Sequence, residues 1–422
     1  MGSLFARPAP PPGRGVPPGI SDWSELWDLL WSGEVVKAGK LWWQAKWNAA
    51  EMKAFQDHIV GHSNTDEQTL GRQGTDIFLG DKQNRHERIY QAALASKAVY
   101  TLSGPMSSTP DIVSTTAFTS LEQNYVIEKH DNPNYLFWKE YPKDWILCSP
   151  RTDDQGQERF YLFSVKGTVG ADDWLDNLAA GNNPRIQRGL LKEGQQMLEQ
   201  AGQTLRDLLN EKKRVVFTGH SAGGAVAAYV YKELYREAVQ KKAHWNMDCV
   251  VFGCAATDDR QVTFPAPGID ASDDDIGMMM VDEENDDTEE HNNNPNIRIA
   301  FCNRWDPVPR VTVSYVDWFV DNWNLYHALS DPEAREAFEY TPLPTDALVP
   351  FGQLVTLSDA PEVPPTGNTN TLARWLTPEQ FRTLVYLDPV QHSMGLYIQR
   401  VTRLLTQSGF RGTDPGVQQA LG

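Results

Sequence analysis

The segment RVVFTGHSAGGAVAAYVY (214–231) decides the fold, because it joins an apolar, β-branched run to a helix-forming run through a glycine-rich turn. The first run predicts a buried strand, and the second predicts a helix that begins at once. So sharp a strand-to-helix turn is typical of a nucleophile elbow, in which a strained backbone presents the side chain at its apex. Ser221 is at that apex, and we expect its hydroxyl to be exposed beside the first N–H groups of the helix.

Small residues around this serine support the same interpretation. The elbow is formed by Gly219, His220 and Gly223, and a Cβ atom at either glycine would collide with the neighbouring helix or strand backbone. The pattern GxSxG is a weak signal by itself. The strand before it and the helix after it predict an activated serine rather than a plain Gly-Ser loop.

An activated serine needs a general base, a carboxylate that orients this base, and donors for an oxyanion. In folds that use such an elbow, the carboxylate and the histidine follow the serine in the chain. The alternating run NIRIAFCN (296–303) predicts a strand, and Asp306 comes just after its carboxyl end, where parallel sheets place ligand chemistry. Taken alone, Asp306 is also typical of a turn former beside Pro307. With Ser221 in place, we expect Asp306 to be the orienting acid.

Chain order leaves His327 and His392 as candidate bases. His327 lies in NLYHALSDPEA, a helix-like stretch that favours a packing or surface role. His392 lies in LDPVQHSMGLYIQRVTRLL, between the last predicted strand, FGQLVTL (351–357), and the last amphipathic helix. A lone histidine at a helix start is commonly a surface residue. The order Ser221, Asp306, His392 nevertheless predicts a catalytic triad.

Two backbone N–H groups are predicted to form the oxyanion hole. One belongs to Ala222, the residue after the nucleophile, and the other to a residue at the end of an upstream strand. The run ERFYLFSVKGT supplies that strand, and Gly167 and Thr168 form a tight turn at its end. An ordinary glycine turn is the alternative for this segment. We expect the Thr168 amide to be the second donor.

Four segments resemble, in order and spacing, the class 3 lipases, the family of the fungal triacylglycerol lipases. The likeness extends over about residues 90–400. It implies an α/β-hydrolase fold, with a mostly parallel central sheet covered by helices on both faces, and it gives the triad and oxyanion residues the roles stated above. The segments are SVKGTVGADDWLDNL, VVFTGHSAGGA, FCNRWDPVPRV and LDPVQHSMGLYI.

The resemblance also implies a lid. In the family, the segment aligned with ADDWLDNL forms a short helix whose tryptophan meets lipid, which makes Trp174 a candidate lid or substrate residue. This chain departs from the family pattern at two points. Lys166 stands where the family usually has Arg, and GCAATDD (253–259) replaces a turn of the GAP type.

The composition of the chain and the places of its Pro-rich, Trp-rich and acidic segments predict one large enzyme domain with extensions. The chain has 422 residues, of which 40% are hydrophobic and 22% charged. These values suit a single α/β core. We expect a disordered Pro-rich tail (1–20), a Trp-rich helical extension (21–85), a hydrolase domain (86–410) with an acidic insert (260–295), and a C-terminal tail (411–422). No signal peptide or apolar run of membrane-spanning length is evident, which predicts a cytoplasmic protein.

The net charge of −18 is mostly local, because eleven acidic residues lie between Asp270 and Glu290. A stretch with so much charge and little apolar surface is expected to be a disordered, solvated loop, although Met278–Met280 leave contact with lipid or a partner open. The acidic balance argues against nucleic acid and against tight binding to anionic membranes. It fits a neutral ester substrate, and protein partners stay unknown.

The cysteines and the absent cofactor motifs narrow the chemistry further. Cys249 and Cys254 are expected on opposite faces of one strand, roughly 16 Å apart, which forbids a disulfide between them. All four cysteines are expected to be buried thiols. No Walker loop, dinucleotide fingerprint, HExxH or paired CxxC occurs in the sequence, so neither a metal nor a cofactor is predicted.

The Trp-rich start of the chain leaves two interpretations open. Six of the 14 tryptophans precede residue 48. Trp23, Trp27 and Trp31 are spaced four apart, as are Trp43 and Trp47, which places each set on one face of a helix. Such helices favour a cap on the core, while an interfacial anchor is the alternative, because indoles prefer the boundary between water and lipid. Contact with a lipid surface would then be peripheral.

We expect a serine carboxylester hydrolase that cleaves acyl esters of glycerolipids through an acyl-enzyme. Two other interpretations stay open. One is a catalytically silent, lipase-like scaffold that binds partners. The other is a phospholipase or a further acyl hydrolase, such as an amidase or peptidase, on the same framework.

Overall fold

The fold is taken from a computed structural model of the chain, which describes 16 stretches of residues. Thr168, Trp174, the six early tryptophans and the acidic insert between β6 and β7 lie outside these stretches, and so do the predictions made for them. The described residues are 54–55, 57–59, 72–73, 82–102, 112–130, 143–151, 159–167, 184–243, 245–256, 296–310, 313–344, 348–359, 370–385, 389–412, 416–417 and 419.

One nine-stranded sheet forms the centre of the described part of the molecule, in the order β1-β9-β8-β7-β6-β5-β4-β3-β2. The five strands from β4 to β8 pair in parallel, and the strands at both edges pair antiparallel. The strands are β1 (Arg72–Gln73), β2 (Tyr125–His130), β3 (Trp145–Pro150), β4 (Tyr161–Val165), β5 (Val215–His220), β6 (Met247–Phe252), β7 (Arg298–Asn303), β8 (Gln353–Asp359) and β9 (Thr371–Leu376).

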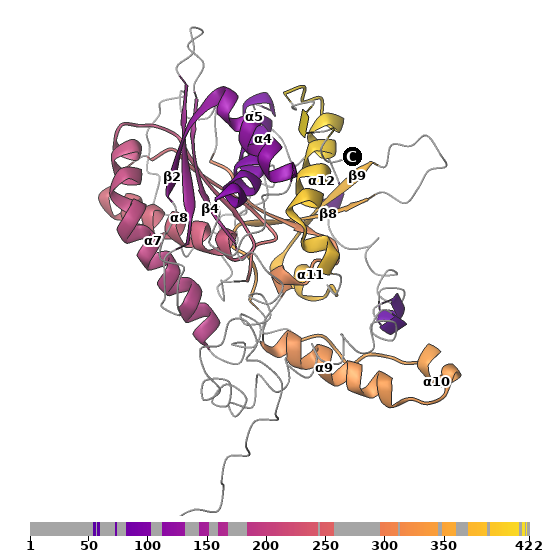
Figure 1. The fold of residues 1–422 in the computed structure, drawn as a ribbon. Coiled ribbons are helices and arrows are strands. Elements are labelled where there is room, and N and C mark those ends of the chain that lie inside the picture. The colour runs from indigo at the N-terminus through magenta and orange to yellow at the C-terminus, as the bar shows by residue number, and fades with distance from the viewer. Residues whose placement is uncertain are drawn as a thin grey trace, which may run out of the picture.

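Helices cover both faces of this sheet, which confirms the predicted α/β-hydrolase fold (Figure 1). Helices α4, α5 and α12 pack on one face, and α7 and α8 pack on the other. The helices are α4 (Lys82–Ala98), α5 (Ile112–Asn124), α7 (Pro184–Asn210), α8 (Ala222–Lys241), α9 (Val313–Ala328), α10 (Pro332–Glu336), α11 (Pro378–Arg382) and α12 (Met394–Gln407), with short 3-10 turns η2 (Val99–Thr101), η4 (Val308–Arg310) and η5 (Pro389–His392).

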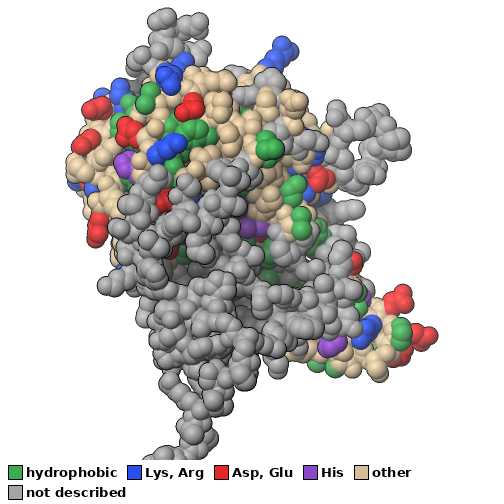
Figure 2. Space-filling model, in the orientation of Figure 1, with side chains coloured by type: hydrophobic (Ala, Val, Ile, Leu, Met, Phe, Trp, Pro, Cys, Tyr) green, Lys and Arg blue, Asp and Glu red, His purple; other side chains and the backbone are tan. Residues whose placement is uncertain are grey.

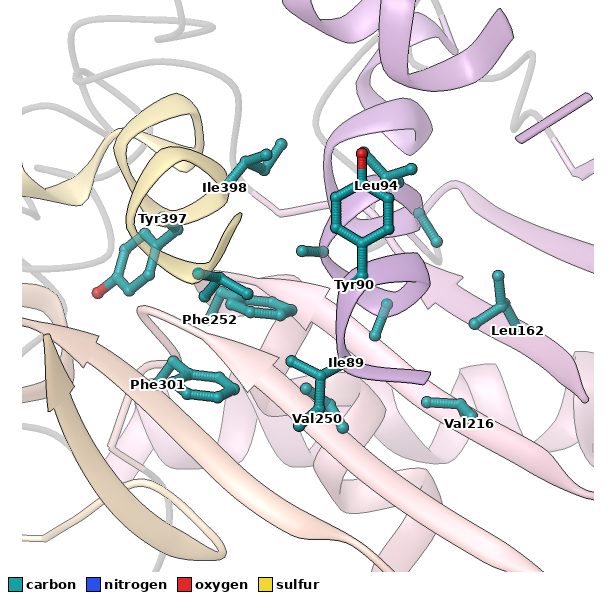
Figure 3. Close-up of a cluster of buried hydrophobic side chains, with 14 of the residues drawn as sticks. Ile89, Tyr90, Leu94, Leu162, Val216, Val250, Phe252, Phe301, Tyr397 and Ile398 are labelled. Carbon is teal, nitrogen blue, oxygen red and sulfur yellow. The ribbon is translucent and has the colours of Figure 1, made fainter. Parts of the chain in front are cut away.

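The central strands are apolar on both sides, as strands covered on two faces must be. In β5, Val216 faces the cluster under α4 and α12, while Val215 and Phe217 face α8. Figure 3 shows the first of these clusters, in which Tyr90 and Leu94 of α4 lie over strand residues of the sheet. The strand β5 therefore lies in the middle of the core, and its carboxyl end is fixed from both sides.

The strand predicted in ERFYLFSVKGT is confirmed as β4, which pairs antiparallel with β3. The prediction that FGQLVTL is the last strand is wrong. A further strand, β9, formed by TLARWL (371–376), pairs antiparallel with β8. It lies between β8 and the short edge strand β1, and three of its six residues are buried. The segment assigned to the C-terminal tail contributes the buried Val417 to the core.

All four cysteines are free and buried, as predicted. The expected placement of two of them on opposite faces of one strand is wrong. Strand β6 ends at Phe252, and Gly253 turns the chain with φ of +50°. Cys254 therefore leaves the strand, and its side chain joins the same apolar cluster as Cys249.

A third apolar cluster lies outside the sheet, in the projection formed by α9 and α10 (Figure 1). Trp318, Trp323 and Tyr326 of α9 pack there against Phe55 and Ile59 of the N-terminal extension. Acidic side chains gather at the far end of this projection, near α10 (Figure 2). Among the helices that the structure describes, none is long and apolar enough to cross a membrane.

Candidate active site

Ser221 lies between the end of β5 and the start of α8, in a strained backbone conformation with φ of 60° and ψ of −133°. A positive φ is uncommon for a residue other than glycine and is held only by strong surroundings. Here the N–H of Ser221 donates to the carbonyl of Phe252 at 3.0 Å, which continues the pairing of β5 with β6. The predicted elbow is therefore formed at this serine.

The glycines of the elbow are required by close approach, as the sequence predicts. A Cβ atom at Gly219 would lie 2.6 Å from the carbonyl carbon of Gly223. A Cβ atom at Gly223 would lie 2.3 Å from the carbonyl oxygen of Val165. Any larger residue would separate helix α8 from the ends of β4 and β5.

The expectation of an exposed hydroxyl is wrong, because Ser221 is only 2% exposed. The end of β4 packs against the elbow. A Cβ atom added to Gly167 would meet the Cβ of Ser221 at 3.2 Å and the carbonyl oxygen of His220 at 2.4 Å. Gly167 is therefore in close contact with the elbow.

Asp306 follows the carboxyl end of β7 and is fully buried. The backbone reaches it through Trp305, which has a φ of 76°. Three groups donate to its carboxylate: the N–H of Val308 at 2.9 Å, the hydroxyl of Tyr397 at 2.6 Å, and Nδ1 of His392. Hydrogen bonds from several donors fix the orientation of a buried carboxylate.

His392 lies at the end of η5, directly before α12, and its Nδ1 atom is 2.9 Å from Oδ2 and 3.1 Å from Oδ1 of Asp306. Because a carboxylate only accepts, Nδ1 carries the proton, and Nε2 is left to accept another. The turn at Gly253 borders this pair. A Cβ atom there would lie 2.9 Å from Oδ2 of Asp306 and 3.1 Å from Cε1 of His392.

The structure thus brings two of the predicted triad residues into direct contact, across 86 positions of the chain. Ser221 is connected to this pair through its backbone and through the residue before it. Its N–H binds Phe252, the neighbour of Gly253, and the ring of the preceding residue, His220, stacks on the ring of His392 with centroids 4.4 Å apart. His327 is in α9, where it stacks on Trp323, in line with the packing role expected for it.

Of the two predicted oxyanion donors, the structure describes Ala222. It is the first residue of α8, where backbone N–H groups have no acceptor within the helix. Lys166, at the departure from the family pattern, is buried in an ion pair with Asp144 at 3.0 Å, and its Nζ also donates to the carbonyl of Leu102 at 2.6 Å. The lysine therefore anchors the chain just before Gly167.

Sequence reasoning missed three polar residues at this site. Tyr397 binds Asp306, Tyr100 binds His220 with its hydroxyl 3.1 Å from Nδ1, and the Nδ2 group of Asn303 donates to the carbonyl of Gln391 at 2.8 Å. The one available signal was the position of Tyr397, five residues after His392 on the predicted helix. Within the described residues, no group of three His, Cys, Asp or Glu side chains could hold a metal ion.

The sequence matches the family model of the class 3 lipases over residues 160–315, which confirms the resemblance drawn from the motifs. The matched range contains the elbow and Asp306, and His392 follows it. No curated protein matches the chain.

Among solved structures, the chain is similar to the Rhizomucor miehei lipase–propeptide complex, with 17% identity over 76% of this chain and 81% of that chain and a TM-score of 0.40. It is also similar to the lipase of Rhizopus microsporus var. chinensis, with 14% identity over 76% and 88% and a TM-score of 0.40. A third similarity is to the Lip2 lipase of Yarrowia lipolytica, with 11% identity over 75% and 97% and a TM-score of 0.37.

Proposed function

We propose that this chain, with its class 3 lipase segment, is a serine hydrolase that cleaves acyl esters of glycerolipids through an acyl-enzyme. The family match supports carboxylic ester hydrolase activity. The observation that carries the proposal is the hydrogen bond of 2.9 Å between His392 and the buried Asp306, formed beside the strained elbow at Ser221. This pair has the geometry of a base held by its orienting acid.

In the first half of the reaction, the Oγ atom of Ser221 attacks the carbonyl carbon of the ester, and its proton passes to Nε2 of His392. The carbonyl oxygen becomes an oxyanion, which the N–H of Ala222 and the predicted donor Thr168 stabilise. Each such donor lowers the activation barrier by about 3 kcal/mol. His392 then returns the proton to the departing alcohol oxygen, the C–O bond breaks, and the acyl group stays on Ser221.

In the second half, water attacks the acyl-enzyme, and His392 takes a proton from it. The acyl–Ser221 bond breaks, the serine regains its proton, and a fatty acid leaves. Asp306 stays ionised throughout and stabilises the imidazolium that forms twice in each cycle. Trp174 is proposed as the lid residue that meets the lipid.

The nucleophile is tested by labelling with a fluorophosphonate probe and by hydrolysis of p-nitrophenyl butyrate. We expect the purified protein to react with the probe at Ser221 and Ser221→Ala to lose labelling and nearly all hydrolysis. Ser393→Ala is the control, because Ser393 is an exposed neighbour of His392 outside the proposed machinery. Full activity in Ser221→Ala would refute the assignment, and absence of labelling in the native protein would favour the silent scaffold.

The glycerolipid specificity needs a separate test, because the family match is coarser than a substrate. Incubation with triacylglycerol, diacylglycerol and phosphatidylcholine vesicles, followed by mass spectrometry of released fatty acids, ranks these lipids. We expect neutral glycerolipids to be hydrolysed fastest. Faster release from phosphatidylcholine would make the protein a phospholipase instead.

A further inference from the structure

His220 makes one hydrogen bond with each of its ring nitrogens, and both lead away from the elbow. Its Nε2 atom is 2.8 Å from the backbone carbonyl oxygen of His392, and its Nδ1 atom is 3.1 Å from the hydroxyl of Tyr100. The residue is 6% exposed. The side chain next to the nucleophile therefore holds the backbone of the base.

The chemistry of the partners fixes where the protons lie. A carbonyl oxygen only accepts, so Nε2 of His220 carries a proton and donates it to the bond with His392. Burial, and then the neighbouring His392, lower the pKa of His220 well below its ordinary value, so the ring is neutral. A neutral ring with a proton on Nε2 has an acceptor at Nδ1, and the hydroxyl of Tyr100 donates to it.

Tyr100 is held so that it can make this donation. Burial raises the pKa of its hydroxyl, so the proton stays on the oxygen, and the N–H of Gly167 donates to the same oxygen. The buried Lys166 also fixes the backbone near Tyr100, because its Nζ donates to the carbonyl of Leu102, two residues later. Gly167, just after β4, therefore holds Tyr100 in place, and Tyr100 supports the tautomer of His220 that the carbonyl of His392 requires.

A second hydrogen bond holds the carbonyl group of Gln391, the residue before His392 in η5. The side-chain amide of Asn303, at the end of β7, donates to the carbonyl of Gln391 at 2.8 Å. Two successive carbonyl groups of η5 are thus fixed by the ends of the strands that precede the nucleophile and the acid. Positioning of this kind matters because a misplacement of about 1 Å costs on the order of a hundredfold in rate.

We propose that His220 is a positioning residue, which holds the loop of His392 through its Nε2–H group while Tyr100 fixes the required tautomer. The inference rests on the proposed ester hydrolysis at Ser221. It assigns the elbow histidine a task beyond packing, since the ring next to the nucleophile joins the backbone of the base to Tyr100 through two hydrogen bonds.

The test compares His220→Gln with His220→Met. The two side chains have similar length, and the amide nitrogen of Gln lies as many bonds from Cα as Nε2 of His, so that only Gln can restore the donor. With p-nitrophenyl butyrate, we expect kcat of His220→Met to fall by about tenfold to a hundredfold with KM little changed. We expect His220→Gln to recover most of this loss.

A spectroscopic readout separates positioning from stability. The Nδ1–H proton that His392 shares with Asp306 should give a far-downfield NMR signal in the native protein and in His220→Gln, and a weakened one in His220→Met. If His220→Met fails to fold, Tyr100→Phe replaces it, because loss of the hydroxyl frees the other tautomer of His220. We then expect kcat to fall severalfold, by the loss of about one hydrogen bond.

Native kcat in His220→Met, or in Tyr100→Phe where that variant is used, would overturn the inference, and so would equal losses in the Gln and Met variants. These results are distinguishable from a failure of the proposed function. In the first case Ser221 is still labelled by the fluorophosphonate and Ser221→Ala is still inactive. In the second case Ser221→Ala retains its activity whatever stands at residue 220.

Discussion

Two fully buried aspartates at opposite ends of neighbouring strands have different partners. Asp248, near the amino end of β6, lies 2.7 Å from Arg88 and 3.3 Å from Arg214, and it accepts the N–H of Ile297 at 2.5 Å. Asp306, after the carboxyl end of β7, accepts from a tyrosine, a backbone N–H and a histidine. Burial is equal, but Asp248 is paired with permanent cations, whereas Asp306 accepts hydrogen bonds from the three donors just named.

The different partners of these two aspartates show that a buried carboxylate can serve either stability or catalysis. A carboxylate paired with arginines is already neutralised and stabilises the fold, because breaking such a pair leaves a buried charge. A carboxylate held by neutral donors keeps an electrostatic field that a new cation can use. That cation is the imidazolium of His392 during the reaction. We call the side of the sheet where the parallel strands begin the amino edge and the side where they end the carboxyl edge. The buried aspartate at the amino edge serves stability, and the one at the carboxyl edge serves catalysis.

The largest expected effect comes from Asp306→Asn. The amide N–H₂ group would face Nδ1 of His392 and favour the wrong tautomer, so we expect kcat to fall by about 10⁴-fold, the loss seen for this exchange in a serine protease triad. The variant should still fold, because the amide oxygen at the Oδ1 position can accept from Val308, and the N–H₂ group at the Oδ2 position can donate to the hydroxyl of Tyr397. Hydrolysis of p-nitrophenyl butyrate and thermal melting measure the two quantities, and a loss below tenfold would contradict the role of Asp306.

The matching change at the amino edge, Asp248→Asn, should have the opposite outcome. Arg88 and Arg214 would lose the carboxylate while still buried, which is expected to lower the free energy of unfolding by about 3–5 kcal/mol. Denaturant unfolding measures this loss, and kcat per fluorophosphonate-reactive molecule should be unchanged. Asp359→Asn is the control, since its ion pair with Arg400 is 42% exposed on the acid and should contribute at most about 1 kcal/mol.

Much of the carboxyl edge could be predicted from the sequence, because its backbone demands leave local signals. Close approach at Gly219 and Gly223 requires glycine, and the strand-to-helix change around Ser221 is visible as a change in periodicity. The parallel core and the place of Asp306 at a strand end followed in the same way. Chain order left His327 and His392 as candidate bases, and the sequence around each of them favoured His392.

The remainder depends on contacts between segments far apart in the chain, which carry no local pattern. Tyr100 and His220 are 120 positions apart, and Arg88 and Asp248 are 160 apart. Strand β9 was missed because only half of its residues are buried, which leaves a weak apolar pattern, and because residues 360–370 separate it from β8 in the sequence. The placement of Cys254 failed because one glycine ended β6 earlier than the apolar pattern suggested.

The smallest expected effect concerns the charge of His220, and it sharpens the contrast between the two edges. Positive charge is permanent beside Asp248, whereas beside Asp306 it should be absent until the reaction creates it. The groups that face His220 are His392, Tyr100, Tyr397 and Lys97, and none of them is an acid. Burial and His392 therefore keep its pKa well below the usual 6.5.

This shift has a defined sign for stability. Below about pH 6.5 the unfolded chain binds a proton at residue 220 and the folded chain does not. The free energy of unfolding therefore decreases as the pH is lowered, by up to about 1.4 kcal/mol per pH unit. His220→Gln removes the titrating group. We expect the stability difference between the native protein and this variant to be constant above about pH 7 and to shift in favour of the variant as the pH falls toward about 5. Urea unfolding across this range measures the difference, and a difference that does not change with pH would mean that His220 carries its proton in the folded state.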